Sequence, residues 1–305
     1  MGDVLGVLQV VSDLDQRVAF FTHVLEFEEI QRFECKGACW EELFQLPASS
    51  GILVELRLGN ETLYLMQFLP GQGAPYPKNS RSDDLWFQHI AIVVSDMQKA
   101  HTKLMKHGVQ SISDFHQTIP QSNATAAGIK AFYFRSPDGH PLELISFPPH
   151  KGNPRWQSKS SLFLGIDHTA IVISNTEKSL PFYQDLFGMR VVGGSLNYGE
   201  EQEKLSGVLE AKVKITSLCF FGSEGMGIEF LEYLHPIGGR KKAKETRAHH
   251  LTETQTVIAI DNISFGRQAI SLEGGAWNKG LMIRDPDGHR VLVVEKKKNN
   301  YANKI

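Results

Sequence analysis

The feature that most constrains this chain is a repeat within its own sequence, because repeated segments fold as copies of one structural unit. Segment 13–27 (DLDQRVAFFTHVLEF) matches segment 175–189 (NTEKSLPFYQDLFGM) at a shift of 162 residues. The tetrapeptide Pro-Asp-Gly-His also occurs twice, at residues 137–140 and 286–289. The sequence therefore predicts that the second part of the chain duplicates the fold of the first.

These matches divide the chain into two halves, a first at residues 1–150 and a second at residues 161–297. The polar stretch 148–160 has the composition of a linker. Residues 298–305 form a polar tail that follows the second half.

Each half itself contains two similar segments. Segment 89–96 (HIAIVVSD) is late in the first half, yet it resembles segment 168–175 (HTAIVISN), which is early in the second half. Segments 80–92 and 246–258 also correspond, at a shift of 166 residues. The chain then contains four modules, near residues 3–70, 85–148, 163–235 and 252–296.

The pattern of the second module predicts its local structure. The Val/Ile-rich run 88–94 predicts a strand, and Asp96 stands where a helix N-cap is expected. The helix should end near Gly108, and short strands should follow. Asp138-Gly139 predicts a tight hairpin turn, which needs positive φ. We therefore expect an α+β fold of βαβββ modules.

Composition places few further limits on function. Hydrophobic residues make up 41% of the chain, charged residues 22%, and the formal net charge is −2, as in ordinary globular proteins. This charge gives no reason to expect a nucleic acid or a membrane surface as partner. No apolar run approaches the roughly 20 residues that span a bilayer, and no secretory signal is evident. We expect a cytoplasmic monomer or homodimer that binds a small-molecule substrate.

The strand beginning with His, the helix containing Phe-Tyr, and the late Pro-Asp-Gly-His-x-Leu-Glu together resemble the vicinal oxygen chelate superfamily. That superfamily includes glyoxalase I, methylmalonyl-CoA epimerase, extradiol dioxygenases and bleomycin-resistance proteins. The resemblance extends over nearly the whole chain. It implies paired modules that form curved half-barrels, with metal ligands on the first and last strands of each module. It does not select one reaction, because one fold hosts several chemistries.

Carried over residue by residue, the resemblance implies a metal site with His89 and Glu143 in module two and His168 and Glu229 in module three. Side chains alternate along a strand, so His89 shares its face with Ala91, and both ligands of module two should face an apolar concavity. The second histidines of the Pro-Asp-Gly-His turns are expected to serve the turns rather than the metal.

The corresponding positions of the outer modules are different. They are Gly6 and Tyr64 in module one, and Gln255 and Leu292 in module four. Gly6 and Leu292 have no side chain that can bind a metal. All four ligands meet only if module two closes on module three, with module one on module four. We therefore expect an exchanged pairing with one complete site and one degenerate site.

Two imidazoles and two carboxylates suit one divalent ion such as Ni, Zn, Co, Mn or Fe. Resemblance to glyoxalase I implies a lyase or isomerase that moves a proton on a substrate whose neighbouring oxygens chelate the metal. It also implies Glu143 or Glu229 as the catalytic base. The near symmetry of the site leaves this choice open.

Two other functions remain open at this point. An extradiol ring-cleaving dioxygenase would use Fe(II) with two histidines and one carboxylate, and the second glutamate argues modestly against it. A binding protein of the bleomycin-resistance type would sequester a ligand without metal or turnover. Glutathione-binding residues of glyoxalase I cannot be matched to this chain, so the sequence leaves the substrate open. A lone strand histidine is usually a core residue, but paired ligands in corresponding positions favour the metal site.

Overall fold

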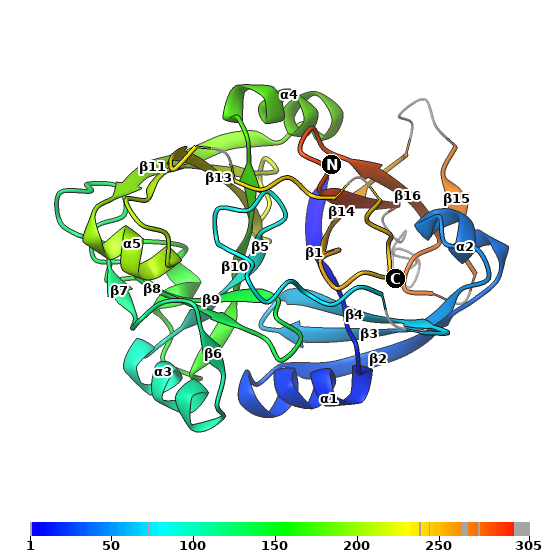
Figure 1. Ribbon diagram of the computed structural model, residues 1–305, viewed down its shortest axis with the longest axis horizontal. Helices are drawn as coiled ribbons and strands as arrows, with labels where there is room; N and C mark the ends of the chain where they lie inside the picture. Colours follow the sequence, from blue (N-terminus) through cyan, green and yellow to red (C-terminus); the bar gives the residue numbers. More distant parts are fainter. Residues whose placement is uncertain are drawn as a thin grey trace, which may run out of the picture.

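The computed structural model describes residues 2–71, 73–237, 239–243, 245–263, 268–273 and 275–295. They form two mixed β-sheets that lie side by side (Figure 1). One of them, the outer-module sheet, contains the strands of modules one and four. Its order is β15 (Ile270–Ser271), β16 (Lys279–Arg284), β17 (Arg290–Glu295), β14 (Gln255–Ile260), β1 (Asp3–Val10), β4 (Glu61–Leu69), β3 (Ser50–Leu58) and β2 (Glu28–Cys35).

The other, the middle-module sheet, contains the strands of modules two and three. Its order is β11 (Arg190–Tyr198), β12 (Lys212–Cys219), β13 (Gly227–His235), β10 (Phe163–Ile173), β5 (Gln88–Val94), β9 (Pro141–Ser146), β8 (Lys130–Arg135) and β6 (Gln110–Ser111). A short strand, β7 (Gln117–Thr118), pairs with β8 beside this path.

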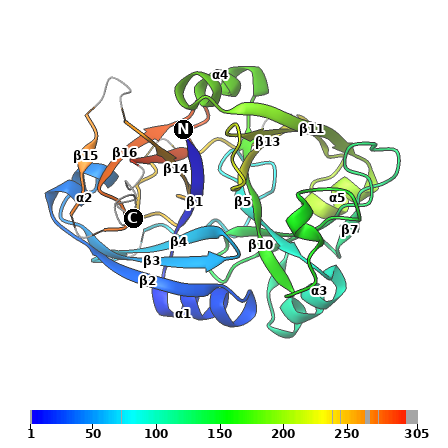
Figure 2. The same cartoon turned by 180° about the vertical axis from the view of Figure 1, so that it is seen from behind.

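The expected exchange of modules is confirmed by the strand order. The first strands of modules two and three, β5 and β10, pair antiparallel at the centre of one sheet. In the same way β1 pairs antiparallel with β14 at the centre of the other sheet. Figure 2 shows the two central pairs from behind. Each sheet therefore takes one module from residues 1–150 and one from residues 161–297, and the α+β prediction of paired half-barrels is correct.

Helices connect the first and second strands of the first three modules. They are α1 (Leu14–Ala19), which continues as a π-helical turn (Phe20–Val24), then α3 (Met97–Lys106) and α4 (Thr176–Phe187). Each begins at an Asx residue that accepts a backbone hydrogen bond: Asp13, Asp96 or Asn175. In module four part of the corresponding segment, residues 264–267, lies outside the described residues, as does the predicted tail 298–305.

Two short helices, α2 (Ala38–Phe44) and α5 (Glu200–Ser206), follow the second strands of modules one and three. A 3₁₀ turn at Pro154–Gln157 lies in the linker between the halves. None of the described helices has both the length and the apolar character that crossing a bilayer requires.

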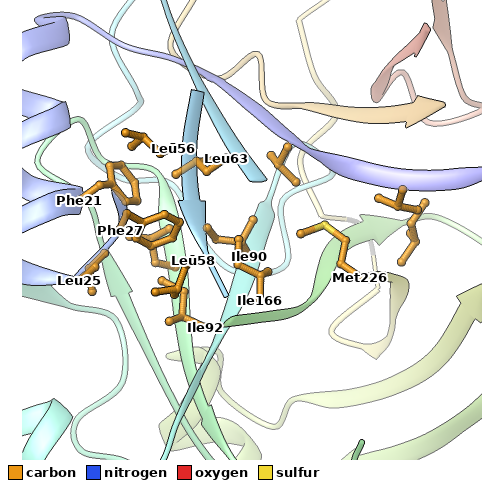
Figure 3. Packing of buried hydrophobic residues seen from close by; sticks show 14 of the residues in the cluster. Phe21, Leu25, Phe27, Leu56, Leu58, Leu63, Ile90, Ile92, Ile166 and Met226 are labelled. Carbon is orange, nitrogen blue, oxygen red and sulfur yellow. The ribbon is translucent and has the colours of Figure 1, made fainter. Parts of the chain in front are cut away.

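Alternation along the strands gives each sheet one face toward a shared core. Ile90 and Ile92 of β5 pack into this core with Ile166 of β10, Leu63 of β4 and Phe21 from the end of α1 (Figure 3). Burial of each of these side chains stabilises the folded protein by about 1.5–3 kcal/mol relative to leaving the side chain exposed. The intervening residues of β5, which include His89 and Ala91, face the opposite, concave side of the middle-module sheet.

The two Pro-Asp-Gly-His turns join the sheets to each other. Asp138, in the turn before β9, accepts hydrogen bonds from the backbone N–H and the hydroxyl of Ser12, and it pairs with Arg17 at 3.0 Å. Asp287, in the corresponding turn, accepts from the backbone N–H of Ser174. His289 Nε2 lies 2.8 Å from the carbonyl oxygen of Val172. These turns therefore hold the start of α1 and of α4 from the neighbouring sheet.

Candidate metal centre

The register of the middle-module sheet brings His89, Glu143 and His168 together. Parallel pairing of β5 with β9 places Ala91 opposite Glu143, and antiparallel pairing of β5 with β10 places His168 opposite Ala91. His89 lies two residues before Ala91 on the same face, so the three side chains converge. One ligand atom from each lies within 4.8 Å of the other two. Glu143 Oε2 is 3.0 Å from His89 Nε2 and 3.6 Å from His168 Nε2.

Glu229 adjoins this cluster from β13. Its Oε2 lies 3.3 Å from His168 Nε2, and its Oε1 accepts a hydrogen bond from Ser217 at 2.7 Å. The side chain is 22% exposed, whereas that of Glu143 is 6% exposed. The structure therefore groups His89, Glu143 and His168, and it places Glu229 beside them, in contact with His168 at the open side of the group. No second group of this kind occurs among the residues described.

The charges of the cluster suit a cation. Burial opposes ionisation of Glu143, but the neighbouring imidazoles of His168 and His89 outweigh it and lower the pKa of that carboxyl to about 2. Burial also opposes charge on His168, yet Glu229, Asp167 and Glu143 raise its pKa well above the ordinary value. Several carboxylates thus surround one imidazole. A divalent ion would supply the positive charge that a proton on His168 supplies otherwise.

His89 adds a further indication. Its side chain is 1% exposed, and its Nε2 makes no aligned hydrogen bond although Glu143 Oε2 lies 3.0 Å away. An unpartnered polar atom is costly in a protein interior. A metal ion between the imidazole and the carboxylate would satisfy both, so the residues present fit such an ion.

Asp167 orients His168, and the sequence analysis did not identify it. A β-bulge between Ile166 and His168 breaks the alternation of β10. Asp167 Oδ2 then lies 3.0 Å from His168 Nδ1, and Asp167 Oδ1 accepts from the indole N–H of Trp156 at 2.6 Å. This contact leaves Nε2 of His168 for a metal, as carboxylate–histidine–metal sites require. The one signal in the sequence is an acidic residue within an apolar strand.

Glu143, His168 and Glu229 line a cavity of about 160 Å³ over the concave face of the middle-module sheet, and His89 lies next to Glu143 outside this lining. The sides of the cavity come from β8, β9, β11, β12 and β13, from α5, and from the loop around residues 119–129. Most of the wall is apolar, as small-molecule sites usually are. The apolar residues that line it include Ile119, Ile129, Ile145, Phe147, Leu205, Val213, Ile215 and Leu231.

The concave face of the outer-module sheet holds no comparable cluster among the described residues. Gly6 packs so closely on β4 that an added Cβ would lie 2.2 Å from the carbonyl oxygen of Thr62. Tyr64 contacts Trp277 edge to face, with ring centroids 4.9 Å apart, and Leu292 is part of the same apolar cluster. Gln255, at the position of His89, is fully buried and its amide has no hydrogen-bond partner. This face is packed as a core rather than built as a ligand site.

A family model described as Glyoxalase/Bleomycin resistance protein/Dioxygenase superfamily matches residues 4–144 and 165–293. A 2-epi-5-epi-valiolone epimerase from Actinomyces sp. is 34% identical over 148 residues, which cover 47% of this chain and 78% of the relative. Glyoxalase I from Saccharomyces cerevisiae is 32% identical over 106 residues, which cover 35% of this chain and 29% of the yeast enzyme.

Similarity to solved structures extends over the whole fold. Glyoxalase I from Zea mays aligns with a TM-score of 0.61 over 97% of this chain and 92% of the maize chain, at 16% identity. A putative dioxygenase from Bacillus subtilis aligns with a TM-score of 0.58 over 97% and 86%, at 12% identity. At these identities the alignments show a common fold only.

Proposed function

Since this chain belongs to the glyoxalase/bleomycin resistance protein/dioxygenase superfamily, we propose that it is a metal-dependent isomerase or lyase that transfers a proton on a small chelating substrate. The observation that carries the proposal is the convergence of His89, Glu143 and His168, with Glu229 beside them, at the wall of a cavity. The names of the two relatives, an epimerase and a glyoxalase I, support a reaction of this kind.

We propose His89, Glu143, His168 and Glu229 as the residues that hold one divalent ion, of the series Ni, Zn, Co, Mn and Fe. A bound ion of this type would act as a Lewis acid and stabilise negative charge on the substrate oxygens. The apolar walls of the cavity exclude water from the carbon that loses its proton. Asp167 keeps the imidazole of His168 in a fixed orientation.

Glu229 is the better candidate for the base. Glu143 is buried and lies between two imidazoles. Glu229 faces the cavity, is partly exposed and contacts only one imidazole. Its hydrogen bond from Ser217, which also lines the cavity, can hold the carboxylate toward a substrate there. A base must reach the proton that it abstracts, and Glu229 has that access.

The first test is the metal content of protein that has been loaded with each ion and dialysed. We expect about one ion per chain, as one complete ligand set implies. His89→Ala and His168→Ala should each abolish retention, because both belong to the same site although they come from different halves. Exposed His107 provides the control, and His107→Ala should retain the ion. Retention of no ion by the unaltered protein would refute the metal-dependent reaction.

The second test concerns proton transfer. The loaded protein is incubated in D₂O with a panel of α-hydroxyketones, and exchange at the carbon next to the carbonyl is followed by proton NMR. We expect exchange with the unaltered protein, and slower exchange with the Glu143→Asp variant. Glu229→Gln should reduce exchange by roughly 10²–10⁴-fold while keeping most of the metal. Oxygen uptake by the Fe(II)-loaded protein with catechols would instead establish ring cleavage and overturn the proposal.

A further inference from the structure

The charges around the cavity restrict what can bind there. Within the described part of the chain, no lysine or arginine lines the cavity beside the metal centre. Glu143, Asp167 and Glu229 do line it. The described lining therefore offers a ligand carboxylates and no lysine or arginine side chain. A carboxylate or phosphate on a ligand would enter this wall without a lysine or arginine to pair with, which disfavours its binding in an enclosed site.

A second cavity, of about 280 Å³, continues from the first. The two share Ile119, Asn197 and Gln202, so these residues stand where one space leads to the other. Again no lysine or arginine is among the described residues that line it, and Glu201 adds a further carboxylate. Among the described residues, therefore, neither cavity is lined by a lysine or an arginine.

The polar side chains shared by the two cavity linings, Asn197 and Gln202, are uncharged. Gln202 is 5% exposed, and no hydrogen bond of its side-chain amide is found among the described residues. Asn197 is 7% exposed and accepts from Asn123 and Ser195 through Oδ1, while its own N–H₂ is not used in these contacts. Nearly buried amides at a cavity wall, here the side chain of Gln202 and the N–H₂ of Asn197, are suited to bind hydroxyl groups, which both donate and accept.

Lys151 contacts the loop that forms part of this wall. Its ammonium donates to the carbonyl oxygens of Ala124 and Thr125, at 3.0 and 2.7 Å. Those residues line the cavities, but Lys151 itself does not. It stabilises the loop from outside and leaves the interior without a positive side chain.

We propose that the substrate of this site is an uncharged, hydroxyl-bearing carbonyl compound, and that Gln202 and Asn197 bind its hydroxyl groups at the junction of the two cavities. The proposal rests on the proposed metal-dependent function, because the carbonyl oxygen and its neighbour are assigned to the ion. Substrates that carry carboxylates or phosphates, such as peptide or nucleotide conjugates, are excluded by the same wall.

The test uses two hydroxypyranones that chelate metals identically. Kojic acid carries a hydroxymethyl group where comenic acid carries a carboxylate, and the two otherwise have the same structure. Binding of each to metal-loaded protein is measured by isothermal titration calorimetry. We expect kojic acid to bind at least roughly tenfold more tightly, which corresponds to about 1.4 kcal/mol. Comenic acid binding as tightly as kojic acid would overturn the proposal.

Two variants test the role of Gln202. Gln202→Leu should weaken kojic acid several-fold, because the hydroxymethyl group loses its partner. Gln202→Lys should tighten comenic acid by roughly tenfold and so reverse the preference. Metal content of each variant is measured alongside and should equal that of the unaltered protein. An unchanged preference in the metal-replete Lys variant would count against Gln202 as a recognition residue.

The two proposals fail in different ways. If the unaltered protein retains no metal and binds neither pyranone, the metal-dependent function is wrong. If it retains the metal and binds both pyranones equally, that function stands and the uncharged substrate class is wrong.

Discussion

Asp167 shows how much one residue outside the ligand set can contribute at the residue scale. Its carboxylate fixes Nδ1 of His168, and Trp156 fixes the carboxylate in turn. Mutation of such an outer partner commonly lowers metal affinity 10–100-fold. We expect Asp167→Asn to lower affinity by about that factor, measured by competition with a chromophoric chelator.

The exposed Asp185 provides a matched control for this change, and Asp185→Asn should leave the affinity unaltered. Thermal stability of both variants, measured without metal, separates a loss of positioning from a loss of fold. If Asp167→Asn kept full affinity, the hydrogen bond to His168 would have no part in metal binding.

We expect substitutions of two buried glutamines to change the free energy of unfolding in opposite directions. Gln88 donates to the hydroxyls of Thr169 and Thr256, both at 3.1 Å, and so joins the two sheets. Gln255 has no partner for either amide atom. Removing an unpartnered buried amide is favourable, whereas removing a satisfied one leaves its partners unpaired. We expect Gln255→Met to raise the free energy of unfolding by about 1–2 kcal/mol and Gln88→Met to lower it by about 1–3 kcal/mol.

Chemical denaturation of the two variants checks this pair. Metal content should be unchanged in Gln255→Met, because that residue lies in the outer-module sheet, away from the metal centre. A loss of stability in Gln255→Met would show that its amide has a function in this face of the sheet.

The proposed ligand residues could be identified from the sequence because the modules repeat. Aligning segment 89–96 with segment 168–175 identifies both histidines, and alternation along the strands gives the face on which they lie. Asp167 was not accessible in this way. By alternation it should face the shared core, and only the bulge before His168 turns it toward the imidazole. Gln202 was missed because its position depends on α5 packing over the cavity.

At the scale of elements, the turn that contains Asp138 binds the start of α1 through hydrogen bonds and an ion pair. Arg17 and Ser12 hold its carboxylate, and although burial opposes ionisation, these contacts lower the pKa of Asp138 below the ordinary value. A carboxylate with a lowered folded-state pKa stabilises the fold at a pH above its unfolded pKa. That contribution is lost as the pH falls through the folded-state pKa.

We expect Asp138→Asn to lower the free energy of unfolding at pH 7 by about 1.5–3 kcal/mol, because hydrogen bonds to a charged group are lost. The difference from the unaltered protein should begin to shrink below about pH 4, the pKa of aspartate in the unfolded chain, and should disappear once the pH is below the lowered folded-state pKa. Urea titrations at pH 7 and pH 3 measure both. Asp287→Asn is the matched variant and should cost less, since no arginine pairs with Asp287 among the described residues. A constant difference at both pH values would exclude ionisation of Asp138 as the cause.

Most elements follow from local sequence patterns, and the exceptions have physical reasons. Asp13, Asp96 and Asn175 begin their helices as caps, and Gly139 adopts φ 92° in the expected turn. The π-helical continuation of α1 has no local signal, because it arises from packing of Phe20 and Phe21 in the shared core. Strands β6 and β7 are only two residues long, too short for periodicity to locate.

At the scale of the whole molecule, the distribution of ligands was more informative than any single motif. Complete ligands in modules two and three and incomplete ones in modules one and four predicted the exchanged pairing, which the strand order confirms. The sequence does not predict how the concave face of the outer-module sheet is filled. Trp277, Tyr64 and Leu292 pack there as a core, and their side chains meet only after modules from opposite ends of the chain have joined.

Because of this pairing, the two halves of one covalent chain contribute residues to a single site that would otherwise require two separate subunits. His89 and Glu143 come from the first half and His168 and Glu229 from the second, and residues 148–160 tether them. A tether of this length keeps the partners at a millimolar effective concentration even when the protein itself is scarce. The candidate metal centre is therefore assembled within one chain, and its assembly does not depend on the abundance of the protein.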